Sequence, residues 1–345
     1  MTRAILSFSL LIVALFAGGM LYLAMDRNEN WSAEAQNIAD IKPSPIGKCV
    51  NMGNALEAPN EGDWGYRIRQ RDFETIRQAG FDTVRIPIKW TAHASDLPPY
   101  QIDPALLSRV DEVVQQALQS GLNVIINVHH YDEISEDART HLPRLYGIWE
   151  QLFAHYQFYP QTVFFEFLNE PHSDMTARRV DEANRYLLSR LREMDQDRWV
   201  ILGGGRWGTL DGLLETHPPY DPRAMVTFHY YSPFEFTHQG APWTHKPIPK
   251  GQVWGSLEDR REMAKDFSRA ARWRDQAGMP LLLGEFGVYK DVEETQRASW
   301  IGHVRKTAET VEFGWCYWDW ATSLGIYDLE AENFKPGMEN ALFGE

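Results

Sequence analysis

Short apolar runs alternate with helical patterns along most of the chain. Eight runs rich in branched aliphatic and aromatic residues predict buried strands at 49–54, 82–88, 122–129, 162–168, 198–203, 225–231, 280–286 and 313–319. Several are continuously apolar, which is typical of parallel strands covered on both faces. Between them, apolar residues three and four positions apart predict amphipathic helices within 66–79, 103–121, 138–157, 180–194, 256–277 and 293–312. The fifth and eighth helices of such a series have the weakest patterns.

The helix within 103–121 carries the clearest boundary signals. Asp103 is a suitable N-cap, Pro104 suits the first turn, and Gly121 suits the C-terminal end. Eight such strand–helix units in about 300 residues favour a single (β/α)8 TIM barrel of the α/β class. A doubly wound open sheet is the alternative that the pattern leaves open.

The N-terminus has a different character from the rest. Residues 4–25 contain no charged side chain, and about 20 apolar residues suffice to cross a bilayer as a helix. We therefore expect a signal peptide or membrane anchor over 1–28, a polar linker over 29–46, and one globular domain over 47–345. The apolar run exceeds the usual length of a signal core, which favours a retained anchor over cleavage. Either outcome predicts export, with Arg3 on the cytoplasmic side.

Composition narrows the range of partners. The chain has 34 Lys and Arg against 48 Asp and Glu, a formal charge of −14. Nucleic acid is therefore a poor partner, because phosphate recognition needs a basic face. Thirteen Trp and 14 Tyr are suited to stacking on sugar rings. Cys49 and Cys316 lie on the first and eighth strands, which are neighbours in a closed barrel, so they could form a disulfide, although pairing within a sheet is often geometrically unfavourable.

Polar side chains gather where the predicted strands end, which is where barrel enzymes carry their active sites. These residues are Asn54, Glu57, Arg85, His129, His130, Asn169, Glu170, His229, Tyr231, Glu285, Trp318 and Asp319. Glu170 and Glu285 follow the fourth and seventh strands, roughly across the barrel from each other. Two carboxyls in different environments provide a general acid and a nucleophile, as cleavage of a glycosidic bond requires. Glu166 lies inside the fourth strand, where we expect a structural carboxylate in a buried ion pair.

Metal chemistry has little support in the sequence. Adjacent His129 and His130 point to opposite faces of a strand, so they cannot easily bind one ion inside the barrel. The first strand has no H-x-H, and no helix carries H-E-x-x-H. We therefore predict no metal and no cofactor.

Six motifs together make the resemblance specific. LNEP at 168–171, GEFG at 284–287, TVRIP at 83–87 and HYY at 229–231 resemble glycoside hydrolase family 5, the large family of retaining cellulases. The segments 51–65 and 236–243 resemble a bacterial subgroup of endo-β-1,4-glucanases, some of which also cut mannans. The resemblance runs from about residue 48 to residue 328, with the motifs in the family's order.

The resemblance implies a role for each matched residue. Glu170 matches the acid/base and Glu285 the nucleophile, while Asn169 matches the residue that binds the sugar 2-OH. Arg85 and Tyr231 match the neighbours of the nucleophile, and we expect the charge of Arg85 to lower the pKa of Glu285. We also expect the pKa of Glu170 to be raised, partly by the charge of Glu285. The remaining matches are sugar-binding positions at His129, His229 and Trp318 and, in the subgroup only, at Asn54, Glu57, His130, His238 and Trp243.

The expected activity is retaining, endo-acting cleavage of β-1,4-glucans by a monomeric catalytic domain. Three alternatives remain open: the same chemistry on mannan, a non-catalytic carbohydrate-binding barrel, and a metal-dependent barrel hydrolase. Among the tryptophans, Trp318 and then Trp243 are predicted to be sugar platforms. Others are predicted to pack in the core, namely Trp149, Trp199, Trp273 and Trp300.

Overall fold

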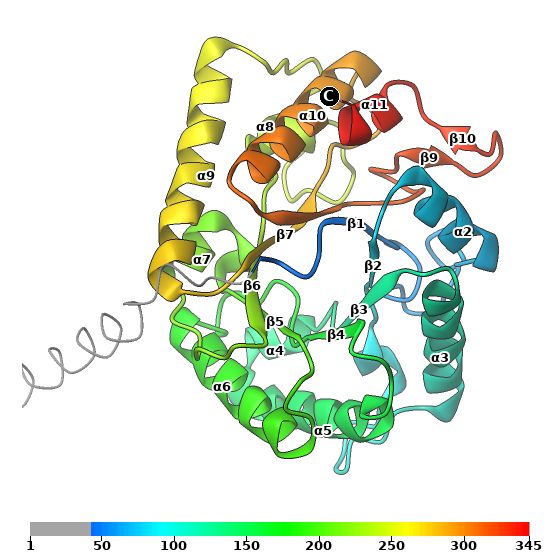
Figure 1. The fold of residues 1–345 in the computed structure, drawn as a ribbon, viewed down its shortest axis with the longest axis vertical. Helices are drawn as coiled ribbons and strands as arrows, with labels where there is room; N and C mark the ends of the chain where they lie inside the picture. The colour runs from blue at the N-terminus through cyan, green and yellow to red at the C-terminus, as the bar shows by residue number, and fades with distance from the viewer. Residues whose placement is uncertain (1–42, 345) are drawn as a thin grey trace, which may run out of the picture.

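Eight parallel strands close into a barrel in the order of the chain (Figure 1). The computed structural model describes residues 43–344, so the segment predicted as signal or anchor lies outside the described residues. The closed barrel confirms the predicted architecture and excludes the open doubly wound sheet. The strands are β1 (Lys48–Asn51), β2 (Thr83–Ile86), β3 (Asn123–Asn127), β4 (Val163–Glu166), β5 (Val200–Gly203), β6 (Ala224–His229), β7 (Leu281–Phe286) and β8 (Gly314–Tyr317).

One helix follows each strand and covers the outside of the barrel. In order these are α2 (Gln70–Ala79), α3 (Pro104–Gln119), α5 (Ala138–Tyr156), α6 (Ala177–Met194), α7 (Leu210–Glu215), α9 (Leu257–Ala277), α10 (Glu294–Thr310) and α11 (Met338–Phe343). The fifth and eighth, α7 and α11, have only six residues each, which explains their weak sequence patterns. In α3, Asp103 accepts a hydrogen bond from the Ala105 N–H at 2.8 Å, as the predicted N-cap requires.

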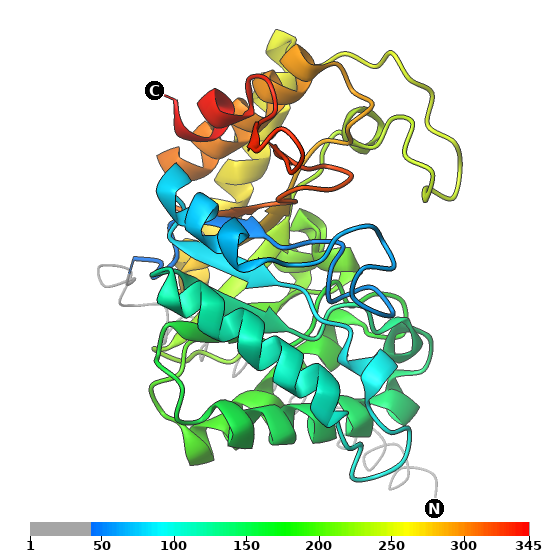
Figure 2. The same ribbon diagram turned by 90° about the vertical axis from the view of Figure 1, so that its right-hand side faces the viewer.

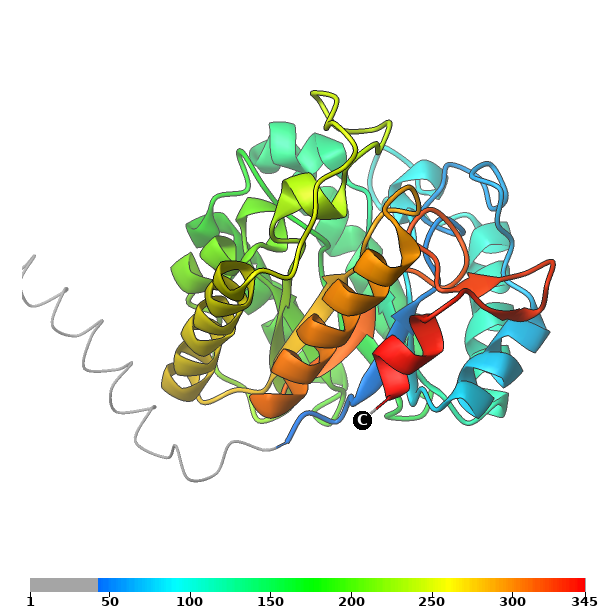
Figure 3. The same ribbon diagram turned by 90° about the horizontal axis from the view of Figure 1, so that it is seen from above.

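Shorter elements lie in the connections between strands and helices. They are η2 (Trp90–His93), α4 (Asp132–Glu136), η3 (Arg206–Gly208), α8 (Phe234–Thr237) and the antiparallel pair β9 (Tyr327–Asp328) and β10 (Asn333–Phe334). The long connections after β1 and β6 project from the same end of the barrel (Figure 2). The chain enters at the opposite end, close to the start of β1 (Figure 3). Within residues 43–344 no helix is long and apolar enough to cross a membrane.

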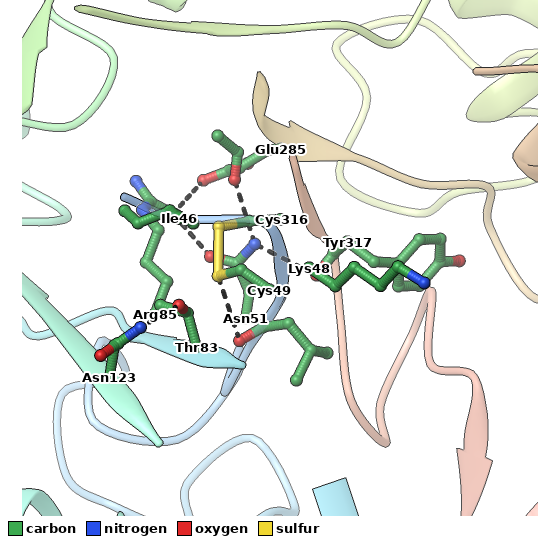
Figure 4. The surroundings of a disulfide bond; sticks show 12 residues. Ile46, Lys48, Cys49, Asn51, Thr83, Arg85, Asn123, Glu285, Cys316 and Tyr317 are labelled. Atoms are coloured by element: carbon green, nitrogen blue, oxygen red, sulfur yellow. Dashed lines mark hydrogen bonds and ion pairs between the residues drawn. A yellow bond between two sulfur atoms is a disulfide. The ribbon is translucent and has the colours of Figure 1, made fainter. Parts of the chain in front are cut away.

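The interior of the barrel forms a second apolar cluster, separate from the core between strands and helices. Cys49 and Cys316 lie in it as register partners on β1 and β8 and form a disulfide (Figure 4). The four tryptophans predicted to pack, Trp149, Trp199, Trp273 and Trp300, are all buried. The interior cluster consists of Ile46, Cys49, Ile125, Phe164, Trp199, Ile201, Met225, Leu282 and Cys316.

Candidate active site

Glu285 lies at the carboxyl end of β7 and is held by hydrogen bonds to both carboxylate oxygens. Its side chain is 6% exposed. Arg85 Nη1 donates to Oε1 at 2.7 Å, and the Tyr231 hydroxyl donates to Oε2 at 2.9 Å. Two fixed donors restrict rotation of the carboxylate and hold it in one orientation.

Glu170 faces Glu285 across the end of the barrel. It lies in the connection after β4, with a positive φ of 46°, and its side chain is 31% exposed. His229 Nδ1 donates to Glu170 Oε1 at 2.7 Å and lies 3.6 Å from Glu285 Oε2. One oxygen of each glutamate and His229 Nδ1 all lie within 4.8 Å of one another. Retaining glycosidases need carboxyl groups about 5–5.5 Å apart and inverting ones about 6.5–9.5 Å, so the close approach of these oxygens favours the retaining type.

The same three side chains are close enough to hold a metal ion. However, both oxygens of Glu285 already accept hydrogen bonds, and one of the donors is the guanidinium of Arg85. A fixed positive charge at 2.7 Å opposes a cation at this position. The arrangement is therefore better suited to moving protons than to binding a metal.

The pKa values of the two glutamates are shifted in the directions opposite to those expected. Burial works to raise the pKa of Glu170, but the hydrogen bond and charge of His229 outweigh it, and the pKa lies below the ordinary value. Burial raises the pKa of Glu285 although His229 and Arg85 oppose it. The prediction of a raised pKa for Glu170 and a lowered one for Glu285 is therefore wrong for the substrate-free site. The reason is that His229 donates its hydrogen bond to Glu170 and so stabilises the ionised form of Glu170. The sequence did not reveal this contact.

Arg85 is the central cation of the site and is completely buried. It forms a two-pronged ion pair with Glu166, with Nε to Oε2 at 2.6 Å and Nη2 to Oε1 at 2.7 Å. This confirms the structural role predicted for Glu166. Nη2 also donates to Asn169 Oδ1 at 2.8 Å, so one guanidinium orients both Glu285 and the residue before Glu170.

Three ring side chains from the carboxyl ends of β3 and β8 pack against one another. Trp318 stacks on His129 with 5.4 Å between ring centroids and 10° between planes. His130 meets His129 edge-on at 4.7 Å. Burial lowers the pKa of His129 well below its usual range, so this imidazole is neutral. The structure thus places His129, His130 and Trp318 together, as predicted for a sugar-binding subsite.

The connection after β6 brings two further predicted residues to the site. His238 meets the Tyr231 ring edge-on at 5.1 Å and stacks on Phe234 at 4.0 Å. Trp243 lies 6.3 Å from His238 and is 51% exposed. An exposed indole connected through His238 to the partner of the nucleophile is well placed to contact a substrate.

Glu57, one of the predicted sugar-binding residues, is buried in the connection after β1. Its side chain has no exposed surface, and it accepts hydrogen bonds from the backbone N–H groups of Asn54 and Ala55. Burial raises its pKa to about 8. Asn54 in turn donates through Nδ2 to Thr322 Oγ1 at 2.7 Å. In this structure the Glu57 carboxylate therefore braces the connection after β1 by accepting from its backbone.

Sequence reasoning missed one polar residue at this end of the barrel and did not choose Trp207 as a sugar platform. Asn51 donates to two strands and accepts from Arg85; the available signal was a polar residue on the same strand face as Cys49. Trp207 stacks on His172 with centroids 4.4 Å apart and remains 54% exposed. The corresponding signal was a tryptophan two residues after the strand-end glycine run 203–205.

A closed (β/α)8 barrel with paired glutamates after β4 and at β7 has the layout of a glycoside hydrolase active site. The comparison with known families agrees and is more specific. Residues 47–323 match cellulase (glycosyl hydrolase family 5), and the chain belongs to that family.

Individual relatives are similar over most of the chain. Endoglucanase H of Acetivibrio thermocellus is 34% identical over 304 residues, which are 86% of this chain but 33% of that protein, so the chain spans about a third of its length. A solved endoglucanase superposes with a TM-score of 0.85 at 40% identity, covering 90% of this chain and 99% of the other. Thermotoga maritima Cel5A superposes at 0.84, with 39% identity in its cellobiose complex and 38% in its mannotriose complex, each covering 86% of this chain and 97% of the other.

Proposed function

We propose that this chain is a retaining, endo-acting hydrolase of β-1,4-glucans. The observation that carries the proposal is the pairing of Glu170 and Glu285, with oxygens within 4.8 Å of each other and the second carboxylate held by Arg85 and Tyr231. This spacing allows direct attack on a sugar and leaves no room for a water between carboxylate and anomeric carbon. The endoglucanases among the relatives support the same activity.

The reaction takes place in two displacements. Glu285 attacks the anomeric carbon while Glu170 gives its proton to the departing glycosidic oxygen, which breaks the sugar–sugar bond and forms a glycosyl ester on Glu285. Water then attacks the same carbon and loses its proton to Glu170, which releases Glu285 as a carboxylate. In total, one glycosidic bond and one water molecule are consumed. The products are two shorter chains, one with a new reducing end and one with a new non-reducing end.

The substrate has to redistribute the proton before the first step. In the substrate-free site His229 donates to Glu170 and favours its ionised form. A glycosidic oxygen placed beside Glu170 offers an acceptor and thereby favours the protonated acid. Formation of the ester removes the negative charge of Glu285, which lowers the pKa of Glu170 and suits it to act as base in the second step.

Mannan is the second candidate substrate. One relative, Thermotoga maritima Cel5A, has been solved with mannotriose as well as with cellobiose. Glucose and mannose units differ in the orientation of the 2-OH, the group that Asn169 is proposed to bind. The endoglucanase relatives favour glucan, and glucomannan contains both sugars.

The test is release of reducing sugar by the full chain from barley β-glucan, carboxymethylcellulose, konjac glucomannan and mannan. We expect activity on the glucans and loss of most of it in Glu170→Gln and in Glu285→Gln. Glu258→Gln, on the exposed side of α9, is the matched control and should retain activity. Activity should also survive a metal chelator. No activity on any of the four polymers, or active glutamine variants at 170 and 285, would contradict the proposal.

We also propose that the protein is exported. The uncharged run at 4–25 supports this, and so does the disulfide between Cys49 and Cys316, because such bonds persist mainly outside the cytoplasm. Cell fractionation and the intact mass of the recovered protein test it. Recovery in the membrane fraction at full mass indicates an anchor, a shorter soluble product indicates cleavage, and a cytoplasmic full-length protein contradicts export.

A further inference from the structure

Asn51, the last residue of β1, is fully buried and uses its whole side-chain amide (Figure 4). Its Nδ2 donates to the carbonyl oxygens of Gly284 on β7 and Tyr317 on β8, each at 3.1 Å. Its Oδ1 accepts from Arg85 Nη1 on β2 at 2.8 Å. One carboxamide therefore ties three other strands of the barrel together.

The Gly284 carbonyl lies in an irregular section of the barrel. The register of β7 against β8 shifts between Leu283 and Phe286, and the register of β6 against β7 shifts between Phe228 and His229. A buried carbonyl that loses its partner on the neighbouring strand costs about 1–3 kcal/mol unless another donor replaces it. The amide of Asn51 supplies a donor at the irregular section, where Gly284 directly precedes Glu285.

Space at this section also leaves little freedom for the backbone. A Cβ on Gly284 would lie 2.3 Å from Thr227 Oγ1 and 3.1 Å from His229 Nε2, so the strand approaches β6 as closely as a glycine allows. Gly284 is held on one side by β6 and on the other by the hydrogen bond from Asn51 to its carbonyl. These two contacts fix the backbone position of the next residue, Glu285.

Asn51 reaches Glu285 by a second route through side chains. Arg85 Nη1 donates both to Asn51 Oδ1 and to Glu285 Oε1, at 2.8 and 2.7 Å. We propose that Asn51 is a positioning residue for Glu285: it holds the irregular section of β7 through Gly284 and aims the guanidinium of Arg85 at the carboxylate. The inference rests on the proposed role of Glu285 as nucleophile.

Only an amide satisfies these contacts. Aspartate has the same shape, but it cannot donate to two carbonyls, and its charge would compete with Glu285 for Arg85. Alanine removes all three hydrogen bonds. The other charged or titratable groups that face Glu285 come from several elements: Arg85 on β2, Glu170 after β4, His229 on β6 and Tyr231 after β6.

The test compares Asn51→Ala and Asn51→Asp with Asn184→Ala. Asn184 is also buried and donates to a strand carbonyl, that of Gly203, at 3.1 Å, but it does not touch Arg85. We expect all three variants to lose stability, and the assays are therefore run well below each unfolding midpoint. The Asn51 variants should lose kcat by about tenfold to a hundredfold with little change in KM, and Asn184→Ala should stay within about twofold of wild type.

A second readout does not depend on turnover. In protein labelled with ¹³C at the glutamate carboxyl, the difference between wild type and Glu285→Gln assigns the signal of Glu285, and its pH titration can be followed in each variant. Asn51→Asp should move that titration to higher pH because it adds a negative charge near Glu285, and Asn184→Ala should leave it unchanged. Folded Asn51 variants with the kcat of Asn184→Ala, or with an unmoved titration, would overturn the inference. Inactive wild type with the predicted titration would refute only the proposed function.

Discussion

The free energy of unfolding of wild type should fall as pH rises because Glu57 is buried. The variant Glu57→Gln should not show this fall. Glu57 is completely buried, and burial raises its pKa from 4.5 to about 8. Below pH 4.5 the carboxyl is protonated in both the folded and the unfolded chain. Between 4.5 and 8 the unfolded chain gives up the proton and the folded chain keeps it, so stability falls as pH rises through this range. Glutamine does not titrate and should show no such fall at this position.

The magnitude follows from the difference between the two pKa values. Each pH unit between them is worth about 1.4 kcal/mol, so wild type should lose stability relative to Glu57→Gln at about that slope from pH 5 to pH 8, up to a total of about 5 kcal/mol. Such a total is a large part of the free energy of unfolding of an ordinary domain.

The assay is urea unfolding of both proteins at a series of pH values from 4 to 9, followed by tryptophan fluorescence. The quantity of interest is the difference in unfolding free energy between them, because all other titrating groups cancel in it. Glu61→Gln is the matched control in the same connection. Burial opposes it, but Arg109 holds the pKa of Glu61 below 4.5, so its contribution is lost only as pH falls below that value. Its difference curve should be flat from pH 5 to pH 8.

Parallel curves for wild type and Glu57→Gln over that range would refute the reasoning. They would mean that Glu57 is ionised in the folded protein and therefore reaches water or a cation. A carboxylate in that state could contact a sugar, as the family resemblance implied. The experiment therefore also decides whether the Glu57 carboxyl stabilises its own connection or is available to bind a sugar.

Two further predictions concern the nucleophile and the disulfide. Tyr231→Phe removes a donor to Glu285, so kcat/KM should fall by about tenfold to a hundredfold and the acidic limb of the pH–rate profile should move to higher pH; an unchanged profile would show that the 2.9 Å contact does not matter in turnover. The double variant Cys49→Ala/Cys316→Ala opens a link across 267 residues and should lower the unfolding free energy by about 2–5 kcal/mol in urea; equal midpoints would refute this.

Local patterns in the sequence were sufficient for the architecture and for the central pair of residues. The spacing of apolar positions predicted the eight strands and six of the helices, because burial of one helix face or both strand faces leaves a regular period. Glu170 and Glu285 could be found because barrel sites gather at strand ends, and Glu166 could be separated from them because it lies inside its strand. Only short elements such as α7 and α11 gave weak signals.

Tertiary structure alone decided the contacts between strands that are remote in the sequence. Asn51 and Gly284 lie 233 positions apart, and only closure of the barrel brings them within 3.1 Å. The order of the pKa values of Glu170 and Glu285 depends on which carboxylate His229 meets, and the role of Glu57 depends on how its connection folds back. Residue type and spacing along the chain determine which chemistry is available, whereas distances of a few ångströms between distant strands determine which group performs it.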